Sequence, residues 1–459
     1  MRPLWGAVRH VHFVGIGGVG MCALAEVLLD DGLMVSGCDS AESDRTRRLS
    51  ARGATVTIGH HSSHVDGVDA VVFSAAITPG HPELQAAHTN GIPVIRRATL
   101  VAEVIRGLRS VAVAGTHGKT TTSALLSHIL DRAGARPTAV VGGLIRGIDG
   151  YGRRGTSDLA VCEADEFDQA FLKLNPLIAV ITNVEEDHLD CYESKEALHS
   201  AFATFTARPP FHGAVLICGD DPGAASLSGC AHAPVITYGL GPGNDLRATG
   251  IKIDGLTSTF TVNKSGQILG EIRLNLPGDH NVRNALAALG AAMELDLNFE
   301  VLAKGFADFG GVGRRFELIG EYRGVTVIDD YAHHPTEITA VLTTARKAFP
   351  GRRIAALFQP HLFSRTQDFA EDFGRALSGA SLGIVLPVFP AREAPIPGVT
   401  HQLVLEKINH LETEVIDGVD LEHIGSILDR VLQNGDVLIT MGAGDIDQVP
   451  TRWMGAAHA

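Results

Sequence analysis

Short apolar runs alternate with helical patterns over the first hundred residues. The runs fit buried strands at residues 11–16, 33–38, 70–74 and 93–96, with a helix at 21–29. Strands that alternate with helices are typical of a parallel, doubly wound sheet. This part of the chain therefore predicts a Rossmann-like domain over residues 1–109.

A second α/β series begins near residue 110. Its pattern predicts strands at 111–114, 159–162 and 177–182 and helices at 120–133 and 281–294. Between residues 211 and 276, short apolar runs are separated by Gly, Asp and Asn turns, which predicts an antiparallel extension of a mainly parallel sheet. We expect a central domain over residues 110–313 that ends in a Gly-rich hinge.

A third series completes the chain. Its apolar runs predict strands at 325–329, 353–358, 383–386 and 437–441, with helices at 335–349 and 366–377. The pattern indicates a second Rossmann-like domain over residues 314–459. The predicted fold class is therefore α/β with three domains.

Composition and charge narrow the functions available to such a fold. The chain has 459 residues, of which 45% are hydrophobic and 20% are charged. This excludes a disordered chain, a collagen-like chain and a heptad rod. The net charge of −14 excludes non-specific electrostatic binding to nucleic acid or to an anionic membrane. An anionic ligand then has to be held locally, by backbone amides, a few Lys or Arg, or Mg²⁺.

The six cysteines form no CxxC pair and show no zinc-site spacing, which predicts buried thiols in a reducing cytosol. Residues 1–6 lack the apolar core of a signal peptide, and no run reaches about 18 apolar residues. We expect a cytoplasmic protein without a membrane span. The oligomeric state is left open.

A GxGxxG motif lies between the first predicted strand and the first predicted helix. Its glycines are Gly15, Gly17, Gly18 and Gly20. They let the backbone approach a diphosphate, and the helix N-terminus supplies N–H groups. Asp39 ends the next strand, where a carboxylate can bind a ribose hydroxyl. The motif predicts a nucleotide-diphosphate site, and the alternative is a tight turn that packs a helix on a sheet.

Residues 115–122, Gly-Thr-His-Gly-Lys-Thr-Thr-Thr, follow a predicted strand and open a helix, as a phosphate-binding loop must. In such a loop the backbone amides cradle phosphates, Lys119 meets the β- and γ-phosphates, and Thr120 binds Mg²⁺. Val113 stands where the general pattern has its first glycine, so the match is imperfect. The context predicts ATP binding.

Two acidic segments, 163–168 and 182–190, follow strands of the same central series. The carboxyl ends of parallel strands meet at one edge of a sheet, where ligands bind. Carboxylate oxygens suit Mg²⁺, and His188 can join them. Beside a phosphate loop the two segments predict metal coordination, whereas each alone also fits a solvated loop.

Further polar motifs lie at residues 277–285, 313–317, 329–335 and 358–366. The first opens a helix, and capping by Asp279 or Asn281 would also explain it. The others lie next to predicted strands, at sheet edges. The Gly-rich segment 441–445 is interpreted as a turn.

The motifs GTHGKTTT, EADEFD, NVEEDHLD, GDHNVRNALAA, GRRFE, DDYAHHPTEI and QPHLFSRT occur in this order, and as a set they resemble the Mur ligases. The opening HFVGIGGVGM is similar to the alanine-adding branch of that family. The resemblance implies three α/β domains that bind a UDP sugar, ATP and an amino acid. It also implies ATP-dependent joining of L-alanine to the lactyl carboxylate of UDP-N-acetylmuramate through an acyl phosphate, in peptidoglycan precursor synthesis.

The same resemblance implies roles for individual residues. Catalytic roles fall to Lys119, His188, His333 and Arg365. ATP contacts fall to Gly115, Thr116, Gly118, Lys119, Thr120, Thr121, His280, Asn281, Asn284, Arg315 and Asp330. The implied Mg²⁺ ligands are Thr120, Glu163 and His188. Substrate contacts fall to Gly15, Gly17, Gly18, Gly20, Asp39 and Ser74 for the UDP sugar, and to Tyr331, His333 and Arg365 for the amino acid.

Two positions depart from the family pattern. Residues 196–213 contain no lysine where several Mur ligases carry a carbamylated one, which fits the alanine-adding branch. Some alanine-adding members have two arginines in this segment. Leu362 stands at the position of the first, and Arg365 matches the second. How the second interaction with the amino-acid carboxylate is made is therefore open.

Three alternatives compete with this interpretation. The nearest is a recycling ligase that joins a tripeptide to the same UDP sugar. An NAD-dependent oxidoreductase would explain the GxGxxG motif and Asp39, but it leaves Lys119 and His188 without a role. A non-catalytic nucleotide-binding protein has no need of Lys119, Glu163 and His188 together.

Overall fold

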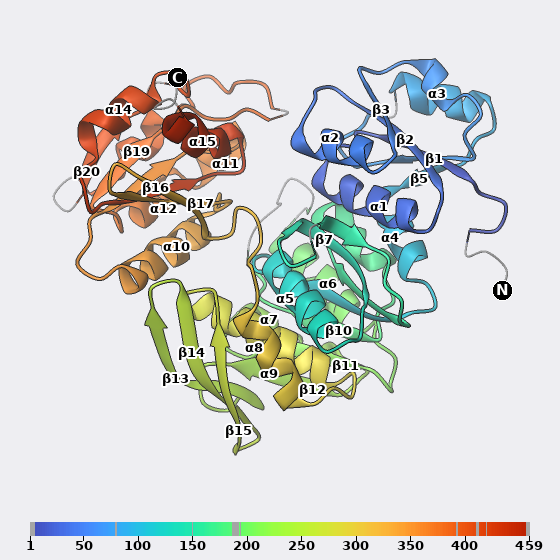
Figure 1. The fold of residues 1–459 in the computed structure, drawn as a ribbon, viewed down its shortest axis with the longest axis horizontal. Coiled ribbons are helices and arrows are strands. Elements are labelled where there is room, and N and C mark those ends of the chain that lie inside the picture. The colour runs from blue at the N-terminus through green and yellow to red at the C-terminus, as the bar shows by residue number, and fades with distance from the viewer. Residues whose placement is uncertain are drawn as a thin grey trace. The chain divides into compact units, whose positions relative to one another are not determined.

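The computed structural model describes residues 5–78, 80–148, 150–185, 192, 194–391, 393–409, 413–418 and 420–455. The chain forms two compact units. The first contains the residues up to 250 together with 260–274 and 282–312, and the second contains 251–259, 275–281 and the residues from 313 onward. Three sheets with flanking helices build these units (Figure 1). The predicted α/β class is thus confirmed.

The first sheet has the order β3-β2-β1-β4-β5, and its neighbouring strands are parallel. The strands are β1 (His10–Val14), β2 (Met34–Asp39), β3 (Thr55–Ile58), β4 (Ala70–Phe73) and β5 (Val94–Arg96). The helices are α1 (Val19–Asp30), α2 (Asp44–Ala51), the 3₁₀-helix η1 (Ser62–Val65), α3 (Pro82–Thr89) and α4 (Arg97–Ile105). The pattern missed β3, because this edge strand is largely exposed and alternates threonine with apolar residues.

The second sheet has the order β15-β14-β13-β12-β11-β10-β6-β9-β7-β8. Its strands are β6 (Arg109–Ala114), β7 (Thr138–Ile145), β8 (Gly150–Arg153), β9 (Leu159–Glu163), β10 (Ile178–Ile181), β11 (Ala214–Cys218), β12 (Val235–Gly239), β13 (Leu246–Asp254), β14 (Thr257–Lys264) and β15 (Gln267–Leu274). Its helices are α5 (Lys119–Arg132), η2 (Phe167–Lys173), α6 (Lys195–Thr206), α7 (Pro222–Ala225), η3 (Ser226–Cys230), α8 (Asp279–Met293) and α9 (Phe299–Ala307).

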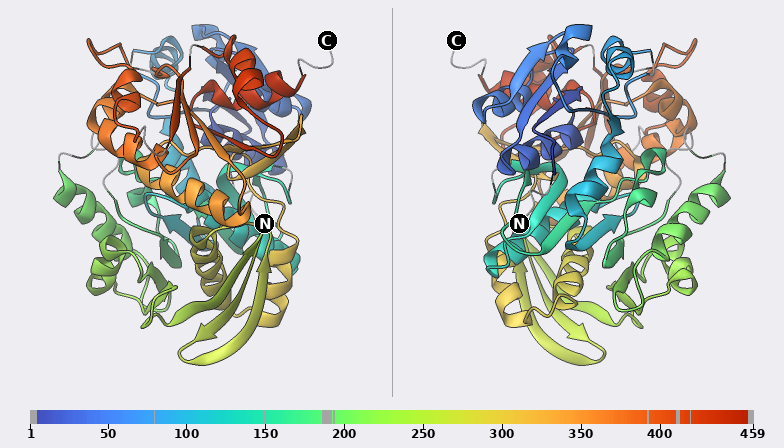
Figure 2. Two further views of the ribbon diagram at one scale, coloured as in Figure 1. Left: turned by 90° about the vertical axis from the view of Figure 1, so that its left-hand side faces the viewer. Right: turned by 90° about the vertical axis from the view of Figure 1, so that its right-hand side faces the viewer.

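The strands from β7 through β9, β6, β10, β11 and β12 to β13 run parallel, and β8 pairs antiparallel with β7. Two-residue connections join β13 to β14 and β14 to β15. Neighbouring strands joined by so short a loop must be antiparallel. The predicted antiparallel extension is therefore these three long strands, which form a twisted ribbon at the bottom of both views in Figure 2.

The third sheet has the order β16-β17-β21-β18-β19-β20, in which only β16 is antiparallel to its neighbour. Its strands are β16 (Glu317–Tyr322), β17 (Val325–Asp330), β18 (Ile354–Phe358), β19 (Leu382–Val385), β20 (Glu414–Asp417) and β21 (Val437–Met441). Its helices are α10 (Pro335–Ala348), α11 (Phe363–Asp368), α12 (Ala370–Leu377), α13 (Gln402–Leu405), α14 (Ile424–Val431), η4 (Asp445–Asp447) and α15 (Gln448–Gly455).

Both faces of the third sheet are covered, which explains why its inner strands β18, β19 and β21 are buried along their whole length. Helices α10 and α12 pack on one face through residues such as Ile338 and Phe373. Helices α14 and α15 pack on the other face through residues such as Leu428 and Trp453. In the part of the chain that the structure describes, no helix is both long and apolar enough to cross a membrane.

Helix α1 packs against the β7–β8 hairpin within the first unit. Glu26 on α1 is buried and accepts backbone hydrogen bonds from Tyr151 at 2.8 Å and Gly152 at 2.9 Å. A side chain at Gly152 would collide with the backbone oxygen of Ala23. The helix that follows the GxGxxG loop is therefore held firmly against the second sheet. The division into domains at residues 109 and 313 stays a prediction.

Candidate active site

The GxGxxG loop crosses from β1 to α1 and is tied to β2. Gly15 has a φ of +77°, and its N–H donates to the Cys38 carbonyl at 2.8 Å. Gly17 donates from its backbone N–H to Asp39 Oδ2 at 2.8 Å, and it has no room for a Cβ beside that oxygen. The structure thus joins Asp39 to the predicted loop. Its contact with a ribose hydroxyl stays a prediction.

Two further segments border this loop. Ser74 follows β4, and Ile77 in the turn that it begins lies next to Gly15, since a Cβ on Gly15 would be 3.7 Å from Ile77 Cδ1. Gly20 lies against Arg97, whose guanidinium pairs with Asp165 at 2.6 Å. Because Asp165 lies in the loop that follows β9 of the second sheet, this ion pair joins the GxGxxG region to the phosphate-binding region. Arg97 is not among the site residues predicted from the sequence.

The phosphate-binding loop follows β6 and opens α5. Lys119 is the first residue of the helix, and its Nζ donates to the carbonyls of Gly115 and Thr116 and to Glu166 Oε1 at 2.8 Å. Burial would lower the pKa of Lys119, but the carboxylates of Glu166, Asp165 and Glu163 raise it. The ammonium is therefore fixed as a positive charge inside the loop.

Glu166 is a site residue that the sequence analysis did not name. Its side chain is only 3% exposed, and burial raises its pKa. The residue directly precedes the 3₁₀-helix η2. The acidic motif contained the signal, but the spacing alone did not show which carboxylate reaches the lysine.

Thr120 and Glu163 meet as predicted. Thr120 Oγ1 donates to both carboxylate oxygens of Glu163, at 3.1 and 3.0 Å, and the Gly142 N–H donates to Oε2 at 2.8 Å. Parallel pairing of β6 with β9 sets Glu163 opposite Val113, directly before the loop. A hydroxyl and a carboxylate form the hard oxygen set that Mg²⁺ prefers, so these two residues fit the implied metal. His188 lies outside the described residues.

The loop after β10 braces the phosphate-binding loop. Asn183 accepts the His117 N–H at 2.7 Å through Oδ1 and donates to the His117 carbonyl at 3.0 Å through Nδ2. Thr182 Oγ1 donates to the same carbonyl at 2.6 Å. Gly115 has a φ of +136°, and a Cβ there would collide with Thr182 Oγ1. The bracing role of Thr182 and Asn183 was not predicted from the sequence.

The predicted adenine-side residues fall into two places. Asn284 on α8 lies against Gly118, where a Cβ would be 2.6 Å from Asn284 Oδ1. Asn281 is buried, and its Nδ2 donates to the Pro277 carbonyl at 2.8 Å, which closes the turn before α8. His280 borders Gly278 in that turn. Asn281 thus has a local structural contact, but its amide donates to a carbonyl and does not accept a helix N–H as a cap would. The contacts of His280, Asn281 and Asn284 with adenine stay predictions.

In the second unit, Asp330 ends β17 and organises the residues around it. Its Oδ2 accepts the Phe316 N–H at 2.7 Å, and its Oδ1 accepts the Ala332 N–H at 2.8 Å. Burial raises the pKa of Asp330 to about 6, although Arg315 and these amides oppose the shift. The carboxyl group thus fixes the turn that presents Tyr331 and His333. Its contact with ribose stays a prediction.

Tyr331 and His333 lie together, as the motif implied. The Arg315 guanidinium carbon lies 5.3 Å from the centre of the Tyr331 ring, and the His333 ring lies 5.2 Å from it. His333 Nδ1 is 2.9 Å from the Tyr331 carbonyl oxygen. Since a carbonyl only accepts, Nδ1 carries the proton in the neutral ring and Nε2 carries the lone pair. Glu337 Oε2 accepts the backbone N–H of His333 at 3.0 Å and so holds this residue in place. Glu337 is not among the site residues predicted from the sequence.

Arg365 lies on α11, where it is 9% exposed. The segment before it contains His361, whose ring is 6.2 Å from that of His333. Leu362 has a φ of +71°, a conformation that a branched side chain rarely adopts. Leu362, which replaces the arginine of some family members, therefore has a strained backbone conformation.

Three family models match the chain in succession. The model of the Mur ligase family catalytic domain matches residues 10–109, that of the Mur ligase middle domain matches 113–292, and that of the Mur ligase glutamate ligase domain matches 314–444. A relative from Geobacter sp. (strain M21), a UDP-N-acetylmuramate–L-alanine ligase, is 44% identical over 447 residues. The match covers 97% of this chain and 97% of the relative.

Solved structures show the same similarity. The UDP-N-acetylmuramate–alanine ligase of Thermotoga maritima is 27% identical, with a TM-score of 0.84 over 98% of this chain and 99% of that one. The murein peptide ligase of Psychrobacter arcticus is 25% identical, with a TM-score of 0.74 over 98% of both chains.

Proposed function

Since the chain belongs to the Mur ligase family, we propose that it joins L-alanine to the lactyl carboxylate of UDP-N-acetylmuramate at the expense of ATP, in peptidoglycan precursor synthesis. The observation that carries this proposal is the 44% identity, over nearly the full length of both chains, to a ligase of that name. These substrates favour a cytoplasmic location. The resemblance to Mur ligases that the motifs indicated is confirmed.

The proposed chemistry has two steps. An oxygen of the lactyl carboxylate attacks the γ-phosphorus of ATP, the bond to ADP breaks, and an acyl phosphate forms. The amine of L-alanine then attacks the acyl carbon, the amide bond forms, and phosphate leaves with the electron pair of the broken C–O bond. Phosphorylation is needed because a carboxylate is a poor electrophile.

Lys119 is the residue that makes the first step feasible. The carboxylate and the γ-phosphate are both anions, so their approach needs fixed positive charge. The ammonium of Lys119 is buried in the loop, where Gly115, Thr116 and Glu166 accept its three N–H groups. Exchange of one of these acceptors for a phosphate oxygen would bring the positive charge to the phosphates. Thr120 and Glu163 would hold Mg²⁺, which adds positive charge beside the phosphates when bound.

The second step needs a neutral amine and an oriented amino acid. His333 is suited to take a proton from the alanine ammonium, because its Nδ1–H donates to the Tyr331 carbonyl and leaves the lone pair on Nε2. Arg365 offers a planar fork that matches a carboxylate. Tyr331 would border the methyl group.

A direct assay tests the proposal. The chain is incubated with ATP, UDP-N-acetylmuramate and L-alanine, and the products are separated and weighed by mass spectrometry. We expect the UDP sugar to gain one alanyl residue for each ADP formed. A UDP sugar that stays unchanged while ATP is hydrolysed would contradict the proposed ligation.

Replacing Arg365 by alanine is expected to raise the KM for L-alanine at least about tenfold, because a hydrogen bond to a charged group contributes about 1.5–3 kcal/mol. The KM for ATP should change little. Arg375→Ala is the matched control, since the Arg375 side chain is 71% exposed and pairs only with surface carboxylates among its described contacts. An unchanged KM for L-alanine in the Arg365 variant would show that Arg365 does not bind the carboxylate of the amino acid.

A further inference from the structure

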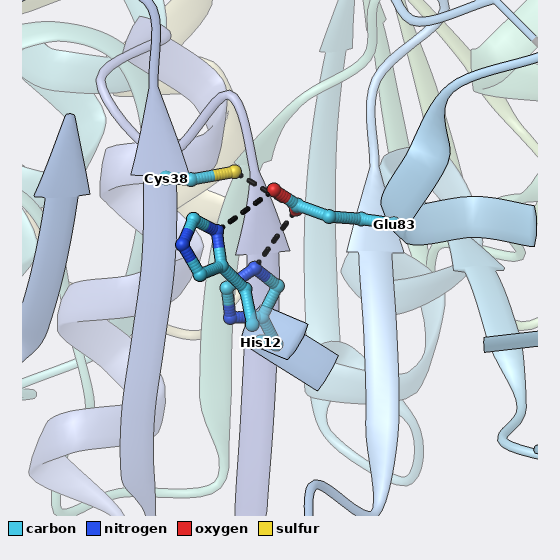
Figure 3. A group of neighbouring side chains, drawn as sticks. His12, Cys38 and Glu83 are labelled. Carbon is cyan, nitrogen blue, oxygen red and sulfur yellow. Dashed lines mark hydrogen bonds and ion pairs between the residues drawn. The ribbon is translucent and has the colours of Figure 1, made fainter. Parts of the chain in front are cut away.

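Four side chains that could bind a metal meet in the first sheet, away from the phosphate-binding loop. His12 comes from β1, Cys38 from β2, His64 from η1 and Glu83 from α3. One ligand atom of each lies within 4.8 Å of the others. Figure 3 shows His12 and Cys38 directed at the Glu83 carboxylate. None of these residues has a role in the proposed ligation.

Glu83 lies at the centre of the group. Its Oε2 is 2.9 Å from Cys38 Sγ and 3.1 Å from His12 Nε2, and its Oε1 is 2.9 Å from His64 Nδ1. Glu83 and Cys38 are fully buried, and His12 is 2% exposed. A buried carboxylate is costly unless it is paired. The fold therefore concentrates a carboxylate, a thiol and two imidazoles in a space closed to solvent on most sides.

Polar groups around the four side chains hold them in position, as the hydrogen-bond partners of metal-binding residues do. Ser36 Oγ lies 2.9 Å from His12 Nδ1, so the proton of the neutral ring can sit on Nδ1 and leave the Nε2 lone pair facing Glu83 and Cys38. The backbone N–H of His61 donates to Glu83 Oε1 at 3.1 Å and fixes the carboxylate. His60 Nδ1 lies 3.1 Å from Cys38 Sγ and 3.6 Å from Glu83 Oε1, so it borders the same group.

We propose that His12, Cys38, His64 and Glu83 bind one Zn²⁺ ion. A tetrahedral zinc site with Zn–N and Zn–O bonds of about 2.0 Å and a Zn–S bond of about 2.3 Å separates its ligand atoms by roughly 3.3–3.5 Å. The observed separations need only small side-chain movements to reach that range. The thiolate selects Zn²⁺ over Mg²⁺ and Ca²⁺, which prefer all-oxygen sets. Binding releases the thiol proton of Cys38 to solvent.

The site is structural, because four protein ligands leave no open position on the metal. It ties β1, β2, η1 and α3 together next to Asp39, which follows Cys38 and accepts the Gly17 N–H. The ligands are spread from residue 12 to residue 83, so no local cysteine spacing reveals them. Cys38 is a buried thiol, as predicted, and the proposed site joins it to ligands that are distant in the sequence.

The test uses the full-length chain stripped of metal with a chelator and then titrated with Zn²⁺ or Co²⁺. Calorimetry is expected to give one equivalent of Zn²⁺, and bound Co²⁺ is expected to show a thiolate charge-transfer band in the near ultraviolet. Cys38→Ser should remove that band. Cys22→Ser, which changes an equally buried thiol on α1, should keep it.

A second variant keeps the proposal testable if Cys38→Ser fails to fold, as judged by circular dichroism. His64 is 19% exposed, so His64→Ala disturbs the core less, and it should weaken Zn²⁺ binding at least about tenfold. Absence of a stoichiometric Zn²⁺ site in the unaltered chain would overturn the proposal. So would an unchanged Co²⁺ band in a folded Cys38→Ser chain, or unchanged affinity in His64→Ala.

Discussion

Lys119→Met is expected to lower turnover by roughly 10²–10³-fold, the loss typical of removing one preorganised electrostatic contact. Methionine keeps the unbranched apolar stem and removes the charge that offsets the repulsion between the carboxylate and the γ-phosphate. Steady-state phosphate release measures the effect. Lys264→Ala is the control, because that lysine pairs with Glu294 at 3.6 Å on the surface of the same unit.

The Lys119 variant must also be separated from a folding defect. Without the ammonium, Glu166 loses its ion-pair partner in a buried position, which costs stability if the carboxyl group stays ionised. The double variant Lys119→Met/Glu166→Gln removes both charges and should recover the melting temperature but not the turnover. Near-normal turnover in either folded variant would rule out the proposed role of Lys119.

Glu163→Gln is expected to raise the Mg²⁺ concentration needed for half-maximal activity by about ten- to hundredfold, which corresponds to the loss of a charged contact. The amide can still accept hydrogen bonds from Thr120 and Gly142, so the fold around β9 should persist. A Mg²⁺ titration of phosphate release checks this, with the surface substitution Glu294→Gln as control. If the Glu163 variant saturates at the same Mg²⁺ concentration as the unaltered chain, Glu163 is not a ligand.

Features that depend on local sequence were predictable. The phosphate-binding loop follows from a strand, a glycine turn and a helix in succession, and all three are present around Lys119. The meeting of Thr120 with Glu163 was also predictable, because paired parallel strands bring their carboxyl ends to one edge of the sheet. The contact between Asp39 and the GxGxxG loop was predictable for the same reason, because Asp39 also ends a strand of a parallel sheet.

Features that depend on how distant elements pack were not predictable from one sequence. Glu166 pairs with Lys119 although 47 residues separate them, and Asn183 braces His117 from the loop after β10, 66 residues away in sequence. The neighbours of Glu83 come from β1, β2 and η1, so neither periodicity nor spacing could unite them. The edge strand β3 was not predicted, because its exposed threonines interrupt the apolar pattern.

The choice of amino acid is the central claim, and phosphate release from ATP tests it most directly. UDP-N-acetylmuramate is supplied with L-alanine, glycine, L-serine or the cell-wall tripeptide in parallel reactions. We expect strong release with L-alanine and weaker release with glycine and L-serine, because one missing methylene changes binding by only about 1–3 kcal/mol. The tripeptide should give none. Efficient release with the tripeptide and none with L-alanine would contradict the account and assign the chain to the recycling ligases.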